Sequence, residues 1–105
     1  MRKFAASIFN RNEANVIMFG LDYTKDSKEI LTKTRKASYF VEPFDPLGKN
    51  LLENVKLFDE GNLRIRNFEE VSKKFREIRE ENKVPLMISR GHLPTFYVTK
   101  NLKKE

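Results

Sequence analysis

The chain has 105 residues, of which 39% are hydrophobic and 34% are charged, and it contains no cysteine. This length fits a single domain over residues 1–105, and the lack of cysteine excludes disulfides, thiolate metal sites and thiol nucleophiles. The formal net charge of +6 makes nucleic acid a candidate partner, and abundant lysine and glutamate without cysteine fit a heat-adapted source. No apolar run is long enough to cross a membrane and the N-terminal apolar patch is too short for a signal peptide, so we expect a cytoplasmic protein.

The first predicted element is a buried strand. Residues 15–20 (NVIMFG) are mostly β-branched, aliphatic or aromatic, and they end in glycine. A short apolar run of this kind is typical of a strand that is covered on both faces.

A helix is predicted next. Asp26 stands in the capping position, with a glutamate three residues later, and Pro43 lies in the loop that ends the helix. Small and apolar residues recur at helical spacing and define an inward stripe, flanked by Leu31 and Ser38. The stripe consists of Ile30, Thr34, Ala37 and Val41.

The second strand and helix follow. Apolar and charged side chains alternate from Val55, which predicts an edge strand closed by Gly61 and Asn62. Asn67 then caps a second amphipathic helix, whose predicted inward stripe extends to Asn82. Polar and charged residues occupy the other side of this helix, so we expect that side to face water.

The last predicted strand is residues 84–89 (VPLMIS), which have a buried pattern. Pro85 lacks the N–H that a central strand needs, so it fits best as the first residue of the strand or at an edge. Pro94 suits the first turn of a third helix. The order β-α-β-α-β-α predicts an α/β protein with three layers, α-β-α, around a short parallel sheet.

Polar residues follow each predicted strand. In parallel α/β sheets ligands bind beyond the carboxyl ends of the strands, so we expect Asp22, Asp59, Glu60, Arg90 and His92 to rim one edge. One histidine with carboxylates is a possible set of ligands for a hard metal ion. Acidic residues after strands are also ordinary turn and cap residues, and this alternative stays open. No phosphate-binding loop, dinucleotide fingerprint or nucleophile elbow occurs, so no catalytic residue is predicted.

Three short motifs also stand in a particular order. Residues 34–38 read TRKAS, residues 59–62 read DEGN, and residues 89–92 read SRGH at the end of the last predicted strand. This series resembles the first part of the ureohydrolase family of arginases and agmatinases, which has Ile-Arg-Glu-Ala-Ser, Asp-x-Gly-Asp and Gly-Gly-x-His in these places. The likeness extends over residues 15–102 and implies the N-terminal half of the arginase fold.

The resemblance implies one metal ligand. In that family the histidine of Gly-Gly-x-His binds a pair of manganese ions, which generate the hydroxide that attacks a guanidinium carbon and releases urea. His92 matches this histidine, whereas the other ligand motifs, Asp-Ala-His-x-Asp and Asp-x-Asp, do not occur in the chain. Arg90 next to the site would repel cations. We therefore expect no cofactor for the isolated chain, and manganese only if the remaining ligands are supplied in trans.

The favoured hypothesis is a truncated ureohydrolase-like protein that is non-catalytic alone and acts as an assembly or interaction module. An unpaired apolar strand edge attracts other strands, so we expect a homo-oligomer, or a partner that covers this edge. The predicted interaction edge consists of Val84, Leu86, Met87 and Ile88.

Two alternatives remain open. In the first, the chain is one part of a split, manganese-dependent guanidino hydrolase that releases urea, with His92 as a metal ligand. In the second, it is a small basic nucleic-acid-binding protein. The basic residues that suggest nucleic-acid binding are Lys33, Arg35, Lys36, Arg64 and Arg66.

Overall fold

The computed structural model describes residues 3–40 and 55–89. Its elements are β1 (Val16–Asp22), α1 (Ser27–Ala37), a 3₁₀ turn (Ser38–Phe40), β2 (Leu57–Arg64), α2 (Glu69–Glu80) and β3 (Val84–Ile88). The predicted alternation of strands and helices is confirmed over this range. The third predicted helix lies outside the described residues.

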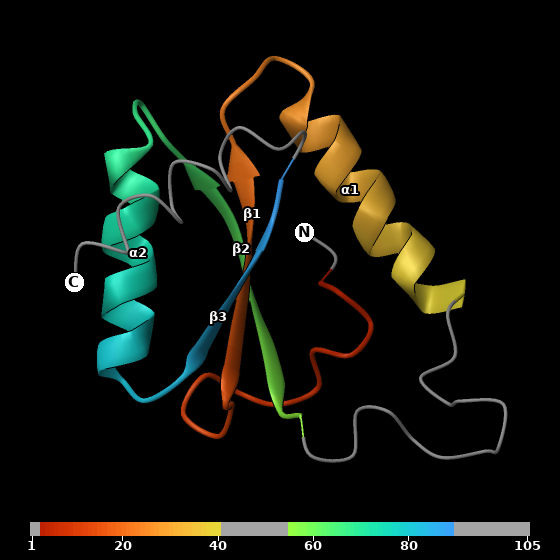
Figure 1. Ribbon diagram of the computed structural model, residues 1–105. Coiled ribbons are helices and arrows are strands. Elements are labelled where there is room, and N and C mark those ends of the chain that lie inside the picture. The colour runs from red at the N-terminus through yellow and green to blue at the C-terminus, as the bar shows by residue number, and fades with distance from the viewer. Residues whose placement is uncertain (1–2, 41–54, 90–105) are drawn as a thin grey trace, which may run out of the picture.

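The described strands form one parallel sheet in the order β2-β1-β3. Figure 1 shows this sheet edge-on, with α2 on one side and α1 on the other, so the predicted three-layer arrangement is confirmed. β1 lies between the other two strands, and a helix covers each of its two faces (Figure 1). This position explains why nearly every residue of β1 is buried, as its unbroken apolar run predicts.

The larger apolar cluster lies between the sheet and α2. Ile17 and Phe19 of β1 pack against Val71 and Ile78 of α2, and all four are fully or almost fully buried. Phe75 meets Phe19 edge to face, with ring centroids 5.8 Å apart. Aromatic pairs favour this geometry, so α2 has one defined position on the sheet.

On the opposite face, α1 approaches β1 closely at Gly20. A Cβ atom at Gly20 would lie 2.6 Å from Oδ1 of Asn62 and 2.9 Å from both methyl groups of Leu31. Glycine is therefore required by the close packing of α1, and β1 continues past it to Asp22.

The inward face of α1 differs from the prediction. The buried residues of the helix are Ser27, Leu31 and Arg35, whereas Ala37 is exposed. The predicted stripe of Ile30, Thr34 and Ala37 is therefore wrong by about one position. The reason is that a buried arginine, which apolar periodicity does not detect, occupies the centre of the inward face.

The predicted end of β2 is also wrong. The strand passes through Gly61 and Asn62 to Arg64, and its register against β1 shifts between the Met18–Asp59 and Gly20–Asn62 pairs. Gly61 has a φ of 96°, which L side chains rarely adopt. Glycine therefore forms a β-bulge inside the strand instead of ending it.

The boundaries of α2 follow its polar residues. Oδ1 of Asn67 accepts hydrogen bonds from the backbone N–H groups of Glu69 and Glu70, which confirms its predicted capping role. Asn82, predicted on the inward stripe, instead adopts a φ of 62° just beyond the helix. In the described part of the chain, no helix is long and apolar enough to span a membrane.

Candidate functional site

The residues predicted to share the carboxyl edge of the sheet are only partly brought together. Asp22 ends β1 and lies in register with Arg64 at the end of β2. Asp59 pairs with Met18 in the middle of β2, and Glu60 follows it inside the strand. The expectation that these two carboxylates rim the same edge as Asp22 is therefore wrong, because the bulge lengthens β2. Arg90 and His92 lie outside the described residues.

Asp59 forms a bidentate ion pair with Arg35 of α1. Nε of Arg35 donates to Oδ2 of Asp59 over 2.7 Å, and the Arg35 NH2 group donates to Oδ1 over 3.0 Å. Both side chains are essentially inaccessible to solvent, at 1% and 0% exposure. The Arg35 NH1 group also donates to Oδ1 of Asn62 over 2.5 Å. Arg35 is therefore a structural residue that holds α1 to β2, and it cannot contact a nucleic acid as hypothesised.

Backbone groups complete the coordination of Asp59. The N–H of Phe4 donates to Oδ2 over 2.7 Å, and the N–H of Gly61 donates to Oδ1 over 3.0 Å. Burial raises the pKa of Asp59, but the hydrogen bonds from Arg35, Phe4 and Gly61 outweigh it and hold this pKa below its ordinary value. The carboxylate is thus kept ionised inside the protein, and both of its oxygens accept hydrogen bonds from protein groups.

The same network holds the N-terminal segment against the sheet. The Ser38 hydroxyl donates to the carbonyl of Arg35 and accepts a hydrogen bond from the N–H of Ala5. Oγ of Ser7 accepts from the N–H of Asp59 over 2.8 Å. Residues from two of the motifs that carry the resemblance, TRKAS and DEGN, therefore meet in one polar cluster. Sequence reasoning missed this contact, although the four-residue spacing of Leu31 and Arg35 was a signal for it.

Glu60 belongs to a different cluster on the α2 side. Its Oε1 lies 3.3 Å from Nε of Arg11. Its Oε2 lies 2.9 Å from Nζ of Lys74, which is an ion pair without an aligned hydrogen bond. Arg11 also forms a bidentate contact with Glu81, at 2.6 and 2.9 Å. These contacts link the N-terminal segment to β2 and to the C-terminal end of α2, and they link β2 to the middle of α2.

The described carboxylates do not form a metal site. Within residues 3–40 and 55–89, no group of three or more His, Cys, Asp or Glu side chains is placed to hold an ion. Both oxygens of Asp59 are bound by Arg35, and Glu60 is paired with cations on the opposite face. These residues therefore do not fit the manganese pair that the resemblance implies. His92, the one residue matched to a ligand, lies outside the described residues.

The predicted interaction edge holds two of the exposed large apolar side chains of the described chain. Val84 and Leu86 of β3 are 60% and 47% exposed, and no residue of the strand is fully buried. The predicted buried pattern of this strand is therefore wrong. The reason is that β3 has only one neighbour, β1, among the described strands.

The fold is similar to that in "The crystal structure of agmatine ureohydrolase of Thermoplasma volcanium", with a TM-score of 0.75 and 20% sequence identity. The likeness covers 95% of this chain but only 38% of that chain. No protein-family model matches the sequence, and no curated protein matches it. At this identity the likeness shows the fold alone. The chain thus has an α/β fold that corresponds to part of the ureohydrolase fold, as the three motifs implied.

Proposed function

We propose that this chain is a non-catalytic assembly module with part of the ureohydrolase fold, and that it docks onto a second copy of itself through β3. The observation that carries the proposal is the exposure of Val84 and Leu86, 60% and 47%, on an outer strand of the described sheet. Apolar strands left uncovered at a sheet edge associate with other strands.

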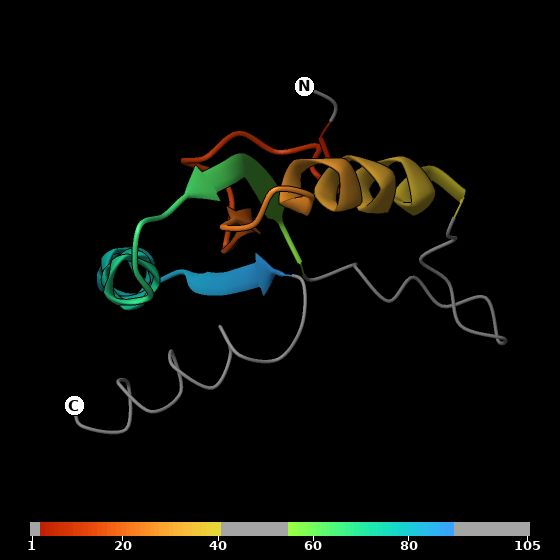
Figure 2. The same ribbon diagram turned by 90° about the horizontal axis from the view of Figure 1, so that it is seen from above.

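The arrangement of the helices explains the exposure. Met87 packs against the apolar cluster next to α2, so alternation along the strand directs Val84 and Leu86 to the other face. Figure 2 shows that α1, on that face, lies beside β1 and β2 and away from β3. The two side chains therefore lack the cover that α1 gives to the central strand.

The backbone of β3 also favours pairing. The N–H of Val84 donates to the carbonyl of Asn15, on the β1 side, over 2.9 Å. In a parallel ladder the polar groups alternate in direction, so the N–H and C=O of Met87 point to the outer edge. Pro85 points the same way, and its missing N–H therefore costs no bond to β1. Two such edges related by a two-fold axis would pair antiparallel around Met87.

A second copy is the occupant because the surface is self-complementary. Val84 and Leu86 are uncharged and apolar, and a two-fold axis would place each against an identical patch. Burying them together would remove apolar area from water, at about 25 cal/mol per Å². Because the patch is uncharged, it does not require a partner protein with a complementary charge.

The test is the oligomeric state of the whole chain. We expect sedimentation velocity to show a concentration-dependent dimer at tens of micromolar, and Leu86→Lys to shift it to monomer. Ile8→Lys is the matched control, because Ile8 is 79% exposed but lies on the N-terminal segment. A monomer at all concentrations, or equal loss in both variants, would contradict the proposal.

A split enzyme is the second candidate, supported by the structural likeness to an agmatine ureohydrolase whose chain is much longer. In this case a separate polypeptide supplies the missing ligand motifs and His92 completes the set. Co-expression with such a polypeptide should give a complex that retains manganese and releases urea. His92→Ala should lower both the metal content and the urea release, whereas Lys36→Ala should change neither. A complex without retained manganese would eliminate this candidate.

A further inference from the structure

A small hollow lies at the carboxyl ends of β1 and β2. It has a volume of about 390 Å³. Its lining comes from the end of each strand, the loop after β1 and the first turn of α1. The lining residues are Asp22, Tyr23, Thr24, Lys25, Lys28, Arg64 and Ile65.

Asp22 is the unusual residue of this hollow. It is only 6% exposed, yet among the described residues no hydrogen bond or ion pair reaches its carboxylate. Its negative charge is therefore not neutralised by the described side chains, and a cationic group in the hollow would gain a charge-assisted hydrogen bond there. Since Asp22 lines the hollow, a ligand in that space would have direct access to it.

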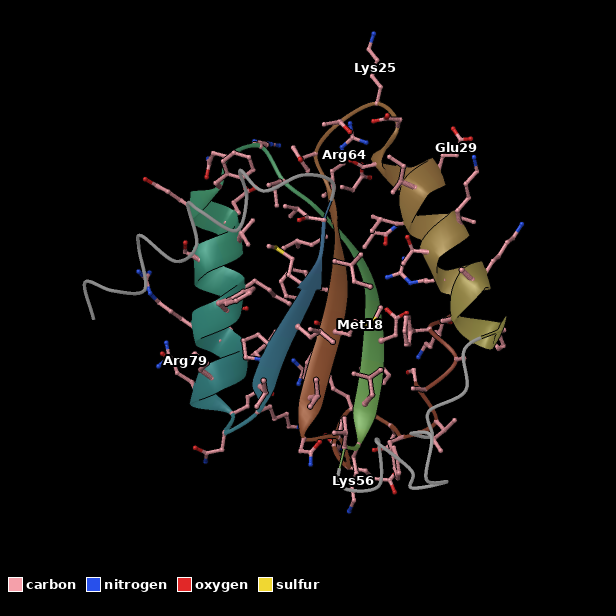
Figure 3. All side chains as sticks on the ribbon, turned by 45° about the vertical axis from the view of Figure 1, so that its right-hand side comes forward. Met18, Lys25, Glu29, Lys56, Arg64 and Arg79 are labelled. Atoms are coloured by element: carbon pink, nitrogen blue, oxygen red, sulfur yellow. The ribbon has the colours of Figure 1, made fainter. Side chains whose placement is uncertain are left out.

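The other charged residues of the lining are cations. Arg64, in register with Asp22, is exposed and has no ion-pair partner within the described residues. Lys28 lies in the first turn of α1, and Lys25 lies on the loop above Arg64, as Figure 3 shows. The nearby carboxylate of Asp26 already accepts a hydrogen bond from Thr24 and is not part of the lining. The rim therefore has excess positive charge.

Two more features favour an anion at the rim. The N-terminus of α1, at Ser27, adjoins the hollow, and the aligned peptide dipoles of a helix attract negative charge there. Arginine binds phosphate through two parallel hydrogen bonds, and lysine adds a compact charge. In parallel α/β sheets this edge is also the usual place for ligands.

We propose that the hollow binds a small zwitterion that carries a phosphate group and an amino group. Arg64, with Lys28, receives the phosphate, and the ammonium of the ligand donates to the carboxylate of Asp22. A ligand with both groups contacts the carboxylate and the basic rim together. None of the described lining residues belongs to β3, so this proposal does not depend on the proposed function.

Isothermal titration calorimetry of the full chain tests the proposal with three probes: O-phosphoethanolamine, ethyl phosphate, which lacks the amine, and ethanolamine, which lacks the phosphate. We expect O-phosphoethanolamine to bind at least about tenfold more tightly than either, since a charge-assisted hydrogen bond is worth about one such factor. Equal affinity for O-phosphoethanolamine and ethyl phosphate would overturn the role of Asp22. Binding only to vesicles of phosphatidylethanolamine would overturn a site for a free small molecule.

Variants test which residue binds the phosphate group of the ligand and which binds its amino group. Arg64→Ala should weaken both phosphate probes about tenfold, and Asp22→Asn should remove the preference for the amino form while ethyl phosphate still binds. Lys36→Ala is the matched control, because it removes one exposed positive charge from the far end of α1. An equal loss in Lys36→Ala would show that only net charge matters and would overturn the site. If Asp22→Asn fails to fold, the comparison of probes on the unchanged chain and Arg64→Ala still decides.

Discussion

Arg35 and Asp59 are bound to each other by two hydrogen bonds, of 2.7 and 3.0 Å, in the interior of the protein. One residue belongs to the TRKAS motif on α1 and the other to the DEGN motif on β2. Through this pair the two motifs hold α1 against the sheet, and the hydrogen bond from Phe4 to Asp59 holds the N-terminal segment in place. Asp59 is thus occupied by protein groups and is not a free ligand.

Removing one partner of this pair should destabilise the protein strongly. Arg35→Met leaves the Asp59 carboxylate buried without its cation, so we expect the free energy of unfolding to fall by about 3 to 5 kcal/mol. The double variant Arg35→Met/Asp59→Asn should lose less than the sum of the two single losses, because no uncompensated charge remains. Urea unfolding followed by circular dichroism measures all four proteins. Additive losses would mean that the two side chains do not stabilise each other.

Low pH should remove the stabilisation that the ionised Asp59 carboxylate gives to the folded protein. Its pKa in the folded protein lies below the ordinary value of 3.8, so folding favours the ionised form. The resulting stabilisation is complete above that ordinary value and is lost as the pH falls through the lower, folded-state pKa. We therefore expect the stability gap between the unchanged chain and Asp59→Asn to be constant near neutral pH and to narrow below pH 3.8. Urea unfolding across this range measures it, and a gap that widened in acid would contradict the assignment.

The strands and helices could be predicted because their signals are local. The apolar run of β1 and the capping side chain of Asn67 follow from neighbouring residues alone. The end of β2 could not be predicted in this way, because glycine at position 61 is equally suited to a turn and to a bulge. Only the pairing with β1 decides between these two uses.

The candidate site was harder to predict than the fold. Carboxylates after strands suggested a common rim, but the partner of Asp59 comes from α1, 24 residues earlier in the chain. Asp22 was correctly placed at a strand end because β1 ends near its glycine. The ligand role of His92 stays a prediction from the resemblance, since it lies outside the described residues.

Gly20→Ala should destabilise the fold through a steric conflict. The new Cβ would lie 2.6 Å from Oδ1 of Asn62 and 2.9 Å from the methyl groups of Leu31. Neither group can move freely, because Asn62 is hydrogen-bonded to Arg35 and Leu31 is 2% exposed. We expect a loss of about 1 to 3 kcal/mol in the free energy of unfolding, as for other overpacked cores. Gly20→Ala/Leu31→Val, which removes one methylene group, should recover part of the loss. If stability did not recover, Leu31 would not be the source of the conflict, and the contact with Asn62 would account for the loss.

Glu60 and Glu81 should contribute unequally to the stability of the folded protein, although both form ion pairs with Arg11. Glu60 is 25% exposed and also pairs with Lys74, whereas Glu81 is 41% exposed, and the hydrogen bond from Arg11 lowers its pKa. We expect Glu60→Gln to cost about 1 kcal/mol and to keep most of that loss in high salt, since partly buried pairs are weakly screened. Glu81→Gln should cost less, and its effect should fade as salt is added. Thermal unfolding of both variants at low and high sodium chloride measures the difference. A larger loss in Glu81→Gln would mean that the N-terminal segment is held mainly at the end of α2 and not at β2.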